Sequence, residues 1–384
     1  MTVVAWGSDR MEFMTFAFDQ LVFTPADVDL SRSPLAGKLG VKTYILGAFN
    51  PGMTRLANGN LLLMVRVAEA LRHPVKEQFI HAIRWTADGY VMDPWPLEMV
   101  DTKDPRKFMI PGGGWKVMAL TSLSWLLPVE LSADGREVVT VHYDRAIEPR
   151  ADYQCYGVED ARISKVGDRY LMTTCSVSPE RHSTTLYSSE DALDWTLEGI
   201  VLDHQNKDML IFEGLVGGKY FAQTRPLGDL YFAYPPGSEW RSGPSINLAT
   251  SPDALHWKPY DKPGIRPHAA TTATARIGGG APPVLTDAGW LTLWHGVEPS
   301  GVVGIYRTYW SILDRDDPSK VVRTSHDALL QPAPVLTEAI KDLMYLDNVV
   351  FTTGIADGGD HWVVASGEAD LACRVTWIDK AAVE

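Results

Sequence analysis

The sequence predicts an all-β protein, and more specifically a five-bladed β-propeller. Its 32 glycines and 25 prolines are spread along the chain and separate short segments rich in Val, Thr, Tyr and Trp. Five times a glycine-containing turn is followed by an apolar, aromatic-rich segment, as expected for five hairpins. The turns are Asn58-Gly59, Val166-Gly167, Gly217-Gly218, Ala288-Gly289 and Gly358-Gly359.

A second repeat supports the same fold. The segment SEDALDW beginning at Ser189 recurs as SPDALHW beginning at Ser251, 62 residues later. Blades of four strands take about 40–50 residues each, so five blades would occupy most of this chain. A β-sandwich is the alternative, because hairpins of this kind occur in any antiparallel protein.

The domain organisation follows from the length and from the distribution of these hairpins. We expect one domain over residues 1–384, with an N-terminal extension over about 1–40 and an insertion near 101–114. Only residues 75–87 and 335–343 have a helical pattern. Neither alternates with strands, so a parallel α/β sheet is not expected.

Composition excludes several classes of protein. With 48 acidic and 35 basic residues the formal net charge is −13, which argues against binding to nucleic acid or to anionic membranes. The chain has no segment of about 18 apolar residues and no signal-peptide pattern at its start. The three cysteines, Cys155, Cys175 and Cys373, lack metal-ligand spacing, which favours reduced thiols and a cytoplasmic location. We expect no metal site, because His268 and His295 have no convincing third ligand.

Three basic side chains share one position in the repeat. Arg66 and Arg225 each follow a turn glycine by seven residues, and His295 follows one by six. Equivalent positions in a propeller converge on the central channel, so these side chains are expected to meet and bind an anion. The alternative is that each pairs with a local carboxylate.

Polar residues also enter the strands that precede these hairpins. Asn50, Asp160 and Asp208 each lie at the start of an apolar segment, where they could bind sugar hydroxyls. A carboxylate in apolar surroundings has a raised pKa and can act as a general acid. Because Glu159 and Asp160 are adjacent, alternation predicts that only one faces the channel. Arg162 would return to the face of Asp160 and could instead hold it ionised, so catalytic and structural roles both remain open.

The chain resembles glycoside hydrolase family 130, a family of five-bladed propellers that includes mannosyl phosphorylases. The resemblance runs from about residue 47 to 371. It rests on seven ordered segments: FNPG with LLLMVR, GVEDARI, NKDMLIFEGLVGGKYFAQTRP, RIGGGAPPV with LTLWHGV, ILDRDDPSKV, DNVVF and GEAD.

The resemblance implies an inverting enzyme that cleaves β-mannosides with inorganic phosphate as co-substrate and without a cofactor. It implies that Asp160 is the general acid, acting through a substrate hydroxyl, and that Asn50 and Asp370 contact the sugar. It further implies that phosphate binds the cations at Lys207, Arg225, Arg276, His295 and Arg66. Because phosphate is the nucleophile, the usual second carboxylate of inverting glycosidases is not needed.

Two departures and two alternatives accompany this interpretation. Ala161 replaces the usual proline after the acid, and the segment 211–214 lacks the family's proline. Some family members are hydrolases, for which Glu213 is the candidate base here. A sugar-binding propeller without catalysis is the alternative from another class. The linkage, the acceptor sugar and a homo-oligomeric state are left open by the sequence.

Overall fold

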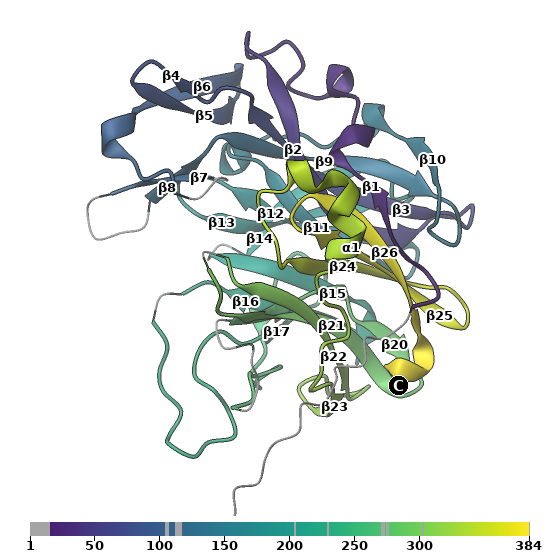
Figure 1. The fold of residues 1–384 in the computed structure, drawn as a ribbon. Helices are drawn as coiled ribbons and strands as arrows, with labels where there is room; N and C mark the ends of the chain where they lie inside the picture. Colours follow the sequence, from purple (N-terminus) through teal and green to yellow (C-terminus); the bar gives the residue numbers. More distant parts are fainter. Residues whose placement is uncertain are drawn as a thin grey trace, which may run out of the picture.

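The computed structural model describes residues 16–103, 107–111, 117–202, 205–228, 230–269, 273, 276–301 and 303–383. Over these residues the protein is all-β, as predicted. It contains five antiparallel sheets of four or five strands each, together with two smaller sheets (Figure 1).

The five large sheets follow one another along the chain. The first contains β2 (Thr43–Arg55), β3 (Leu61–Leu71), β9 (Ser122–Leu131) and β10 (Val138–Val141). The second contains β11 (Val158–Val166), β12 (Arg169–Val177), β13 (His182–Ser189) and β14 (Thr196–Leu202). The third contains β15 (Asn206–Val216), β16 (Lys219–Pro226), β17 (Asn247–Ser251) and β18 (Lys258–Pro259).

The fourth sheet contains β19 (Arg276–Gly279), β20 (Val284–Thr286), β21 (Gly289–Glu298), β22 (Ile305–Leu313) and β23 (Val321–Thr324). The fifth contains β1 (Asp19–Phe23), β24 (Val350–Asp357), β25 (His361–Glu368) and β26 (Ala372–Asp379). The five predicted hairpins are confirmed, since β3, β12, β16, β21 and β25 each begin at or just after the expected turn.

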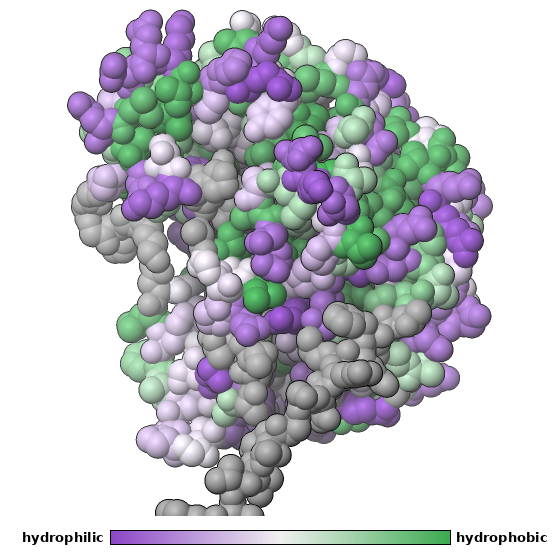
Figure 2. Space-filling view, in the orientation of Figure 1, coloured by the Kyte–Doolittle hydropathy of each residue, from purple (hydrophilic) through white to green (hydrophobic). Residues whose placement is uncertain are grey.

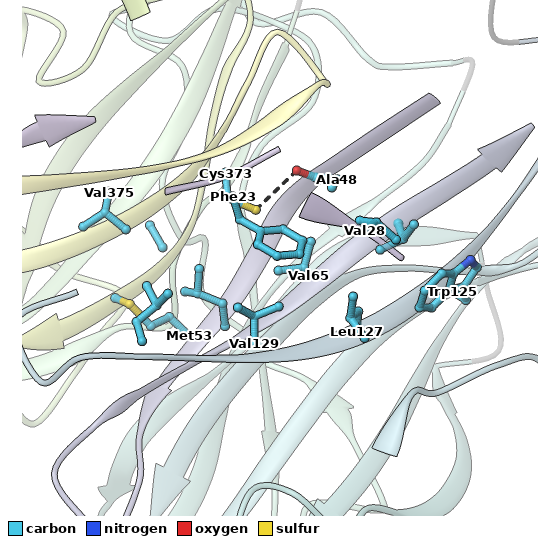
Figure 3. Close-up of a cluster of buried hydrophobic side chains, with 14 of the residues drawn as sticks. Phe23, Val28, Ala48, Met53, Val65, Trp125, Leu127, Val129, Cys373 and Val375 are labelled. Atoms are coloured by element: carbon cyan, nitrogen blue, oxygen red, sulfur yellow. Dashed lines mark hydrogen bonds between the residues drawn. The ribbon is translucent and has the colours of Figure 1, made fainter. Parts of the chain in front are cut away.

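The fifth sheet joins the two ends of the chain. β1 pairs with β26, so residues expected to belong to an N-terminal extension include an edge strand of this sheet. Two short 3-10 helices, η1 (Pro25–Asp27) and η2 (Leu30–Arg32), follow it. The largest cluster of buried apolar side chains lies between the fifth and first sheets and includes Phe23, Val65, Trp125 and Val375 (Figure 3).

The connection between β3 and β9 forms a larger insertion than expected. It contains β4 (Val75–Lys76), β5 (Phe79–Thr86), β6 (Gly89–Pro96), the 3-10 helix η3 (Leu97–Met99), β7 (Lys107–Ile110) and β8 (Val117–Leu120). Residues 104–106 and 112–114 of the predicted insertion lie outside the described residues. The insertion projects from the first sheet at the upper left of Figure 1, and apolar side chains gather there in Figure 2.

The helix expected over residues 75–87 is wrong, because this segment forms β4 and β5. Ile80 and Ala82 are buried at the period of two that a strand requires. They pack in a small core with Phe108 and Ala119 of the other hairpin, so tertiary packing outweighs the local helical pattern.

The second helical expectation is confirmed. Residues 335–343 lie in α1 (Pro334–Thr337) and the 3-10 helix η6 (Glu338–Leu343). The remaining 3-10 helices are η4 (Tyr143–Arg145), η5 (Asp152–Gln154) and η7 (Lys380–Ala382). Within the described part of the chain, no helix has the length and apolar character needed to cross a membrane.

The repeated segments SEDALDW and SPDALHW form the same turn. Ser189 and Ser251 each hydrogen-bond the aspartate two residues later, and the next residues, Ala192 and Ala254, have φ of 64° and 67°. The repeat therefore marks equivalent turns after the third strands of the second and third sheets.

The first strands of successive sheets lie against one another. β2 contacts both β24 and β11, β11 contacts β15, and β15 contacts β19 and β20. This arrangement brings residues from different sheets together at the polar positions that the sequence singled out. The cysteines Cys155, Cys175 and Cys373 are all buried and free of disulfides.

Candidate active site

The site is built on a β-bulge that recurs in three of these first strands. In β2, β11 and β15 two consecutive residues oppose one residue of the neighbouring strand. The first bulge residue is Asn50, Asp160 or Asp208, with φ of 48°, 52° and 59°. Asn and Asp tolerate this left-handed conformation better than other residues that have a side chain. The local backbone thus explains the residue type at these positions.

The basic residues with a shared sequence spacing also share a ladder position. Arg66 pairs with Phe49 and Arg225 with Lys207, in each case opposite the residue just before the bulge. His295 pairs with Gly278 in the fourth sheet. The equivalent residue of the second sheet is Cys175, opposite Glu159, so this sheet contributes no basic side chain at the shared position.

Asp160 is held by two neighbours from the first sheet. Asn50 Nδ2 donates to Asp160 Oδ1 at 2.9 Å, and Arg66 Nη1 donates to the same oxygen at 3.0 Å. Burial raises the pKa of Asp160, but the charges of Arg66 and Lys207 outweigh burial and hold that pKa well below its usual range. The raised pKa expected from apolar surroundings is therefore wrong for the protein without substrate.

Glu159 also belongs to the site, contrary to the alternation argument. Arg66 Nη2 donates to Glu159 Oε1 at 2.7 Å, and Lys207 Nζ donates to Glu159 Oε2 at 3.2 Å. The adjacent carboxylates of Glu159 and Asp160 thus contact the same guanidinium. The physical reason is the bulge at Asp160, which breaks the period of two on which the argument relied.

Asp208 organises a second group of charges. Arg225 contacts Asp208 Oδ2 through Nε at 2.8 Å and Nη2 at 2.7 Å. Arg162 Nη2 lies 3.6 Å from Asp208 Oδ1, and His295 Nε2 lies 3.9 Å from Oδ2. All four side chains are nearly inaccessible to solvent, so these charges interact with little screening.

Arg162 forms no ion pair with the Asp160 carboxylate in the described residues, but its charge adds to those of Arg66 and Lys207 in lowering the pKa of Asp160. Its Nε donates to the Gly280 carbonyl at 2.6 Å, and its Nη1 donates to the Asp160 carbonyl at 2.9 Å. Its nearest carboxylate is that of Asp208. Arg162 therefore ties together main-chain segments of the second and fourth sheets.

His295 is a neutral member of this group. Burial lowers its pKa to about 3, and the neighbouring arginines add to this effect against the opposing charge of Asp208. Its Nδ1 lies 3.2 Å from the Gly279 carbonyl, so Nδ1 carries the proton and donates it there. Counting His295 as a cation was therefore wrong.

The remaining predicted site residues lie around these two groups. Arg276 donates to the Tyr306 hydroxyl, and the Tyr306 ring stacks on His295 with a centroid distance of 5.7 Å. Asp370 has φ of 49° in the turn between β25 and β26, and its charge raises the pKa of Arg66. The structure thus connects all nine predicted residues through direct contacts or electrostatic interactions.

Sequence reasoning missed Tyr306 and a polar pocket behind Asp160. The pocket is lined by residues of the second and third sheets: Asp160, Thr173, Thr174, Cys175, Thr184, Lys207, Asp208 and Met209. Thr174 is the single residue opposite the Asp160 bulge, which explains its place there. No spacing in the sequence indicates Tyr306, because its position depends on the pairing of β22 with β21.

Glu213, the candidate base of the hydrolytic alternative, has different surroundings. Its Oε1 accepts a hydrogen bond from the Lys165 backbone N at 3.2 Å, near the end of β11 remote from Asp160. Burial raises the pKa of Glu213 to about 7. In the described ranges, no group of three or more His, Cys, Asp or Glu residues could hold a metal ion.

Comparison with known proteins gives a consistent family. A family model described as beta-1,4-mannooligosaccharide phosphorylase matches residues 120–383. The chain is 31% identical over 359 residues to a beta-1,2-mannobiose phosphorylase of Listeria innocua, covering 89% of this chain and 92% of that protein. It is also 31% identical over 227 residues to a 1,2-beta-oligomannan phosphorylase of a Thermoanaerobacter species, covering 58% and 68%.

The fold agrees with the sequence comparison. The solved structure of the Listeria innocua enzyme in complex with beta-1,2-mannobiose superposes with a TM-score of 0.78 and 28% identity. The match covers 94% of this chain and 95% of that structure. On the matching family model and these relatives, the chain belongs to glycoside hydrolase family 130.

Proposed function

We propose that this protein cleaves a β-mannosidic bond with inorganic phosphate, giving α-mannose 1-phosphate and a shortened acceptor. The observation that carries the proposal is the position of a buried carboxylate, Asp160, beside a group of cations around Asp208. There, the guanidinium groups of Arg225 and Arg162 face one carboxylate, and Arg276 is close enough to affect His295. The excess positive charge favours binding of a phosphate dianion.

Each predicted residue has a role in this reaction. Arg225 and Arg276 would bind phosphate by charge, and Lys207 and Arg66 would add their charges from beside Glu159. Neutral His295 would accept a hydrogen bond from a phosphate hydroxyl at Nε2, because its Nδ1 proton is donated to Gly279. Asn50 and Asp370 would contact the mannosyl group. Asp208 was expected to bind substrate, but its carboxylate oxygens face cations, so we assign it to positioning Arg225.

The reaction is a single displacement with inversion. A phosphate oxygen forms a bond to the anomeric carbon on the face opposite the leaving group, while the bond from that carbon to the glycosidic oxygen breaks. The leaving oxygen takes a proton that originates on Asp160 and passes through a mannosyl hydroxyl. The β-mannoside thus becomes an α-phosphate, and no second carboxylate is required.

Phosphate binding also helps Asp160 to act as an acid. Without substrate, Asp160 is ionised because Arg66 and Lys207 stabilise its charged form. A bound phosphate adds negative charge beside these cations and so raises the pKa of Asp160. General acid catalysis of this kind contributes about 10²- to 10⁴-fold to the rate.

We further propose that the five large sheets are the blades of one five-bladed propeller. The contacts from β24 to β2, β2 to β11, β11 to β15 and β15 to β19 support a ring of first strands. The pairing of β1 with β26 supports closure by strands from both ends of the chain. A single domain over residues 1–384, a cytoplasmic location and a homo-oligomeric state remain predictions.

The experiment is release of mannose 1-phosphate from β-mannosyl disaccharides with and without phosphate. β-1,2-Mannobiose is the first substrate to test, because three relatives are named for β-1,2-linked mannosides, and β-1,4-linked disaccharides follow. We expect mannose 1-phosphate only when phosphate is present. Free mannose at equal rates in both buffers would instead identify a hydrolase, and binding without turnover would identify a sugar-binding protein.

A further inference from the structure

Glu159 occupies a central position between two cations of the site. Its two carboxylate oxygens bind different partners, Arg66 Nη2 at 2.7 Å and Lys207 Nζ at 3.2 Å. Its side chain is only 6% exposed, so these ion pairs are shielded from water. Arg66 continues from Glu159 to Asp160, where its Nη1 donates at 3.0 Å. The four side chains therefore form one charge cluster, which we call the Glu159 cluster.

Charge balance distinguishes the Glu159 cluster from the group around Asp208. In the first, two carboxylates face two cations, and burial of Glu159 is outweighed by Arg66 and Lys207 so that its pKa is lowered and it stays ionised. Around Asp208, two arginines face a single carboxylate. The positive charge available to an anionic ligand is therefore on the Arg225 side.

Without the Glu159 charge, this balance would change. Arg66 and Lys207 would then face Asp160 as their only carboxylate within the cluster. Two buried cations beside one carboxylate would favour its ionised form more strongly and would also attract a phosphate anion. The first effect would leave a smaller fraction of Asp160 protonated and able to donate.

We propose that Glu159 is a positioning residue that holds Arg66 and Lys207 beside Asp160 and offsets their charge. This lets Asp160 take up and release its proton, and it leaves most of the phosphate binding to Arg225 and Arg276. The inference rests on the proposed phosphorolysis and deepens it, by dividing the cations into a group that controls the acid and a group that holds the nucleophile.

The test is Glu159→Gln, which keeps the shape and one acceptor oxygen but removes the charge. We expect kcat to fall about tenfold or more, because each unit by which the Asp160 pKa falls leaves about tenfold less protonated carboxyl. We expect the KM for phosphate to fall as well, because Lys207 and Arg66 gain net charge. A general structural defect would lower kcat but raise this KM.

The pH profile gives a second readout. The alkaline limb of kcat should move to lower pH in Glu159→Gln, since Asp160 would lose its proton more readily. The charged or titratable groups that face Glu159 are Arg66, Lys207, Asp160, His182 and, across the strand ladder, Cys175. Burial raises the pKa of Cys175 to about 12, so its thiol stays neutral in this range. His182 does not titrate near neutrality, because burial lowers its pKa to about 4.

Two further variants make the result specific. Glu159→Asp keeps the charge and should retain kcat within about tenfold of the wild type. If Glu159→Gln does not fold, Glu159→Asp replaces it as the test. A loss of kcat greater than tenfold in Glu159→Asp would then overturn the proposal. Glu130→Gln is the matched control. Glu130 is a buried glutamate that accepts hydrogen bonds from Asn58 and Asn60 at 2.9 and 2.7 Å. Removing its charge should leave kcat and the KM for phosphate unchanged.

The outcomes separate this inference from the proposed function. If the wild type gives no mannose 1-phosphate, the function itself is wrong, whatever the variants do. If the wild type is active and Glu159→Gln retains its kcat, or loses kcat with a higher KM for phosphate, only the role of Glu159 is wrong.

Discussion

The Asn50 amide donates a hydrogen bond to the Asp160 carboxylate at 2.9 Å, although the two residues are 110 positions apart. Each is the first residue of a bulge, in β2 and β11 respectively, and each has a left-handed backbone. Two sheets therefore present equivalent positions to each other. The contact fixes the carboxylate with a neutral donor in addition to the Arg66 guanidinium.

Asp160→Asn tests the general acid. The substitution keeps a residue type that tolerates φ of 52°, and Arg66 keeps its ion pair with Glu159, so the protein should fold. We expect kcat to fall by about 10²- to 10⁴-fold, because the amide cannot donate the required proton. Phosphorolysis rates and thermal unfolding would be measured together, and a wild-type rate would refute the assignment.

Gly367→Ala tests the contact between Asn50 and Asp160 by displacing the Asn50 side chain. A Cβ at this position would lie 2.0 Å from Asn50 Oδ1 and 2.9 Å from the Asn50 backbone N, so Asn50 must move. We expect kcat to fall about tenfold, a loss of about 1.4 kcal/mol in transition-state stabilisation. The KM for phosphate should change little, because Asn50 contacts the acid rather than the Arg225 group. A change confined to this KM would contradict the assignment.

Gly278→Ala tests the anion-binding group. The added Cβ would lie 2.5 Å from His295 Cε1 and 2.8 Å from Arg225 Nε, so both side chains must shift. We expect the KM for phosphate to rise about tenfold, equivalent to about 1.4 kcal/mol of binding free energy. Steady-state kinetics at varied phosphate would measure it. An unchanged KM would show that phosphate binds elsewhere.

Glu213→Gln tests a pH dependence of stability. The Glu213 pKa is about 7 in the folded protein, against 4.5 for the free side chain. The folded protein therefore binds the Glu213 proton more tightly than the unfolded chain does. This proton binding stabilises the fold fully below about pH 4.5, and the stabilisation is lost as the pH rises through 7. We therefore expect the variant to unfold a few degrees above the wild type at pH 8, with a smaller difference at pH 5.

Thermal unfolding across pH 5–8 would measure this difference. The catalytic rate with phosphate should be close to that of the wild type, since Glu213 contacts the Lys165 backbone rather than the Asp160 region. A selective loss of turnover would instead revive Glu213 as the base of a hydrolase.

Local sequence patterns were enough to predict the hairpins and the shared position of two basic residues. The glycine turns before β3, β12, β16, β21 and β25 were readable because a hairpin is a short-range structure with strong residue preferences. The spacing of Arg66 and Arg225 from those turns also indicated a common ladder position, which the pairing confirms. The segment 75–87 failed because a short apolar segment follows its tertiary partners, here Phe108 and Ala119, rather than its own propensity.

The sequence by itself determined the all-β class, the five hairpins, the family and nine of the polar residues that the structure brings together, though not Tyr306. Only the tertiary structure decided how those residues pair. The bulge at Asp160 turns Glu159 to the same guanidinium, and the packing of neighbouring sheets directs Arg162 to Asp208. It also leaves His295 neutral through burial. The reason is that burial and contacts between sheets depend on residues far apart in the sequence, 93 positions in the case of Glu159 and Arg66, which no local pattern records.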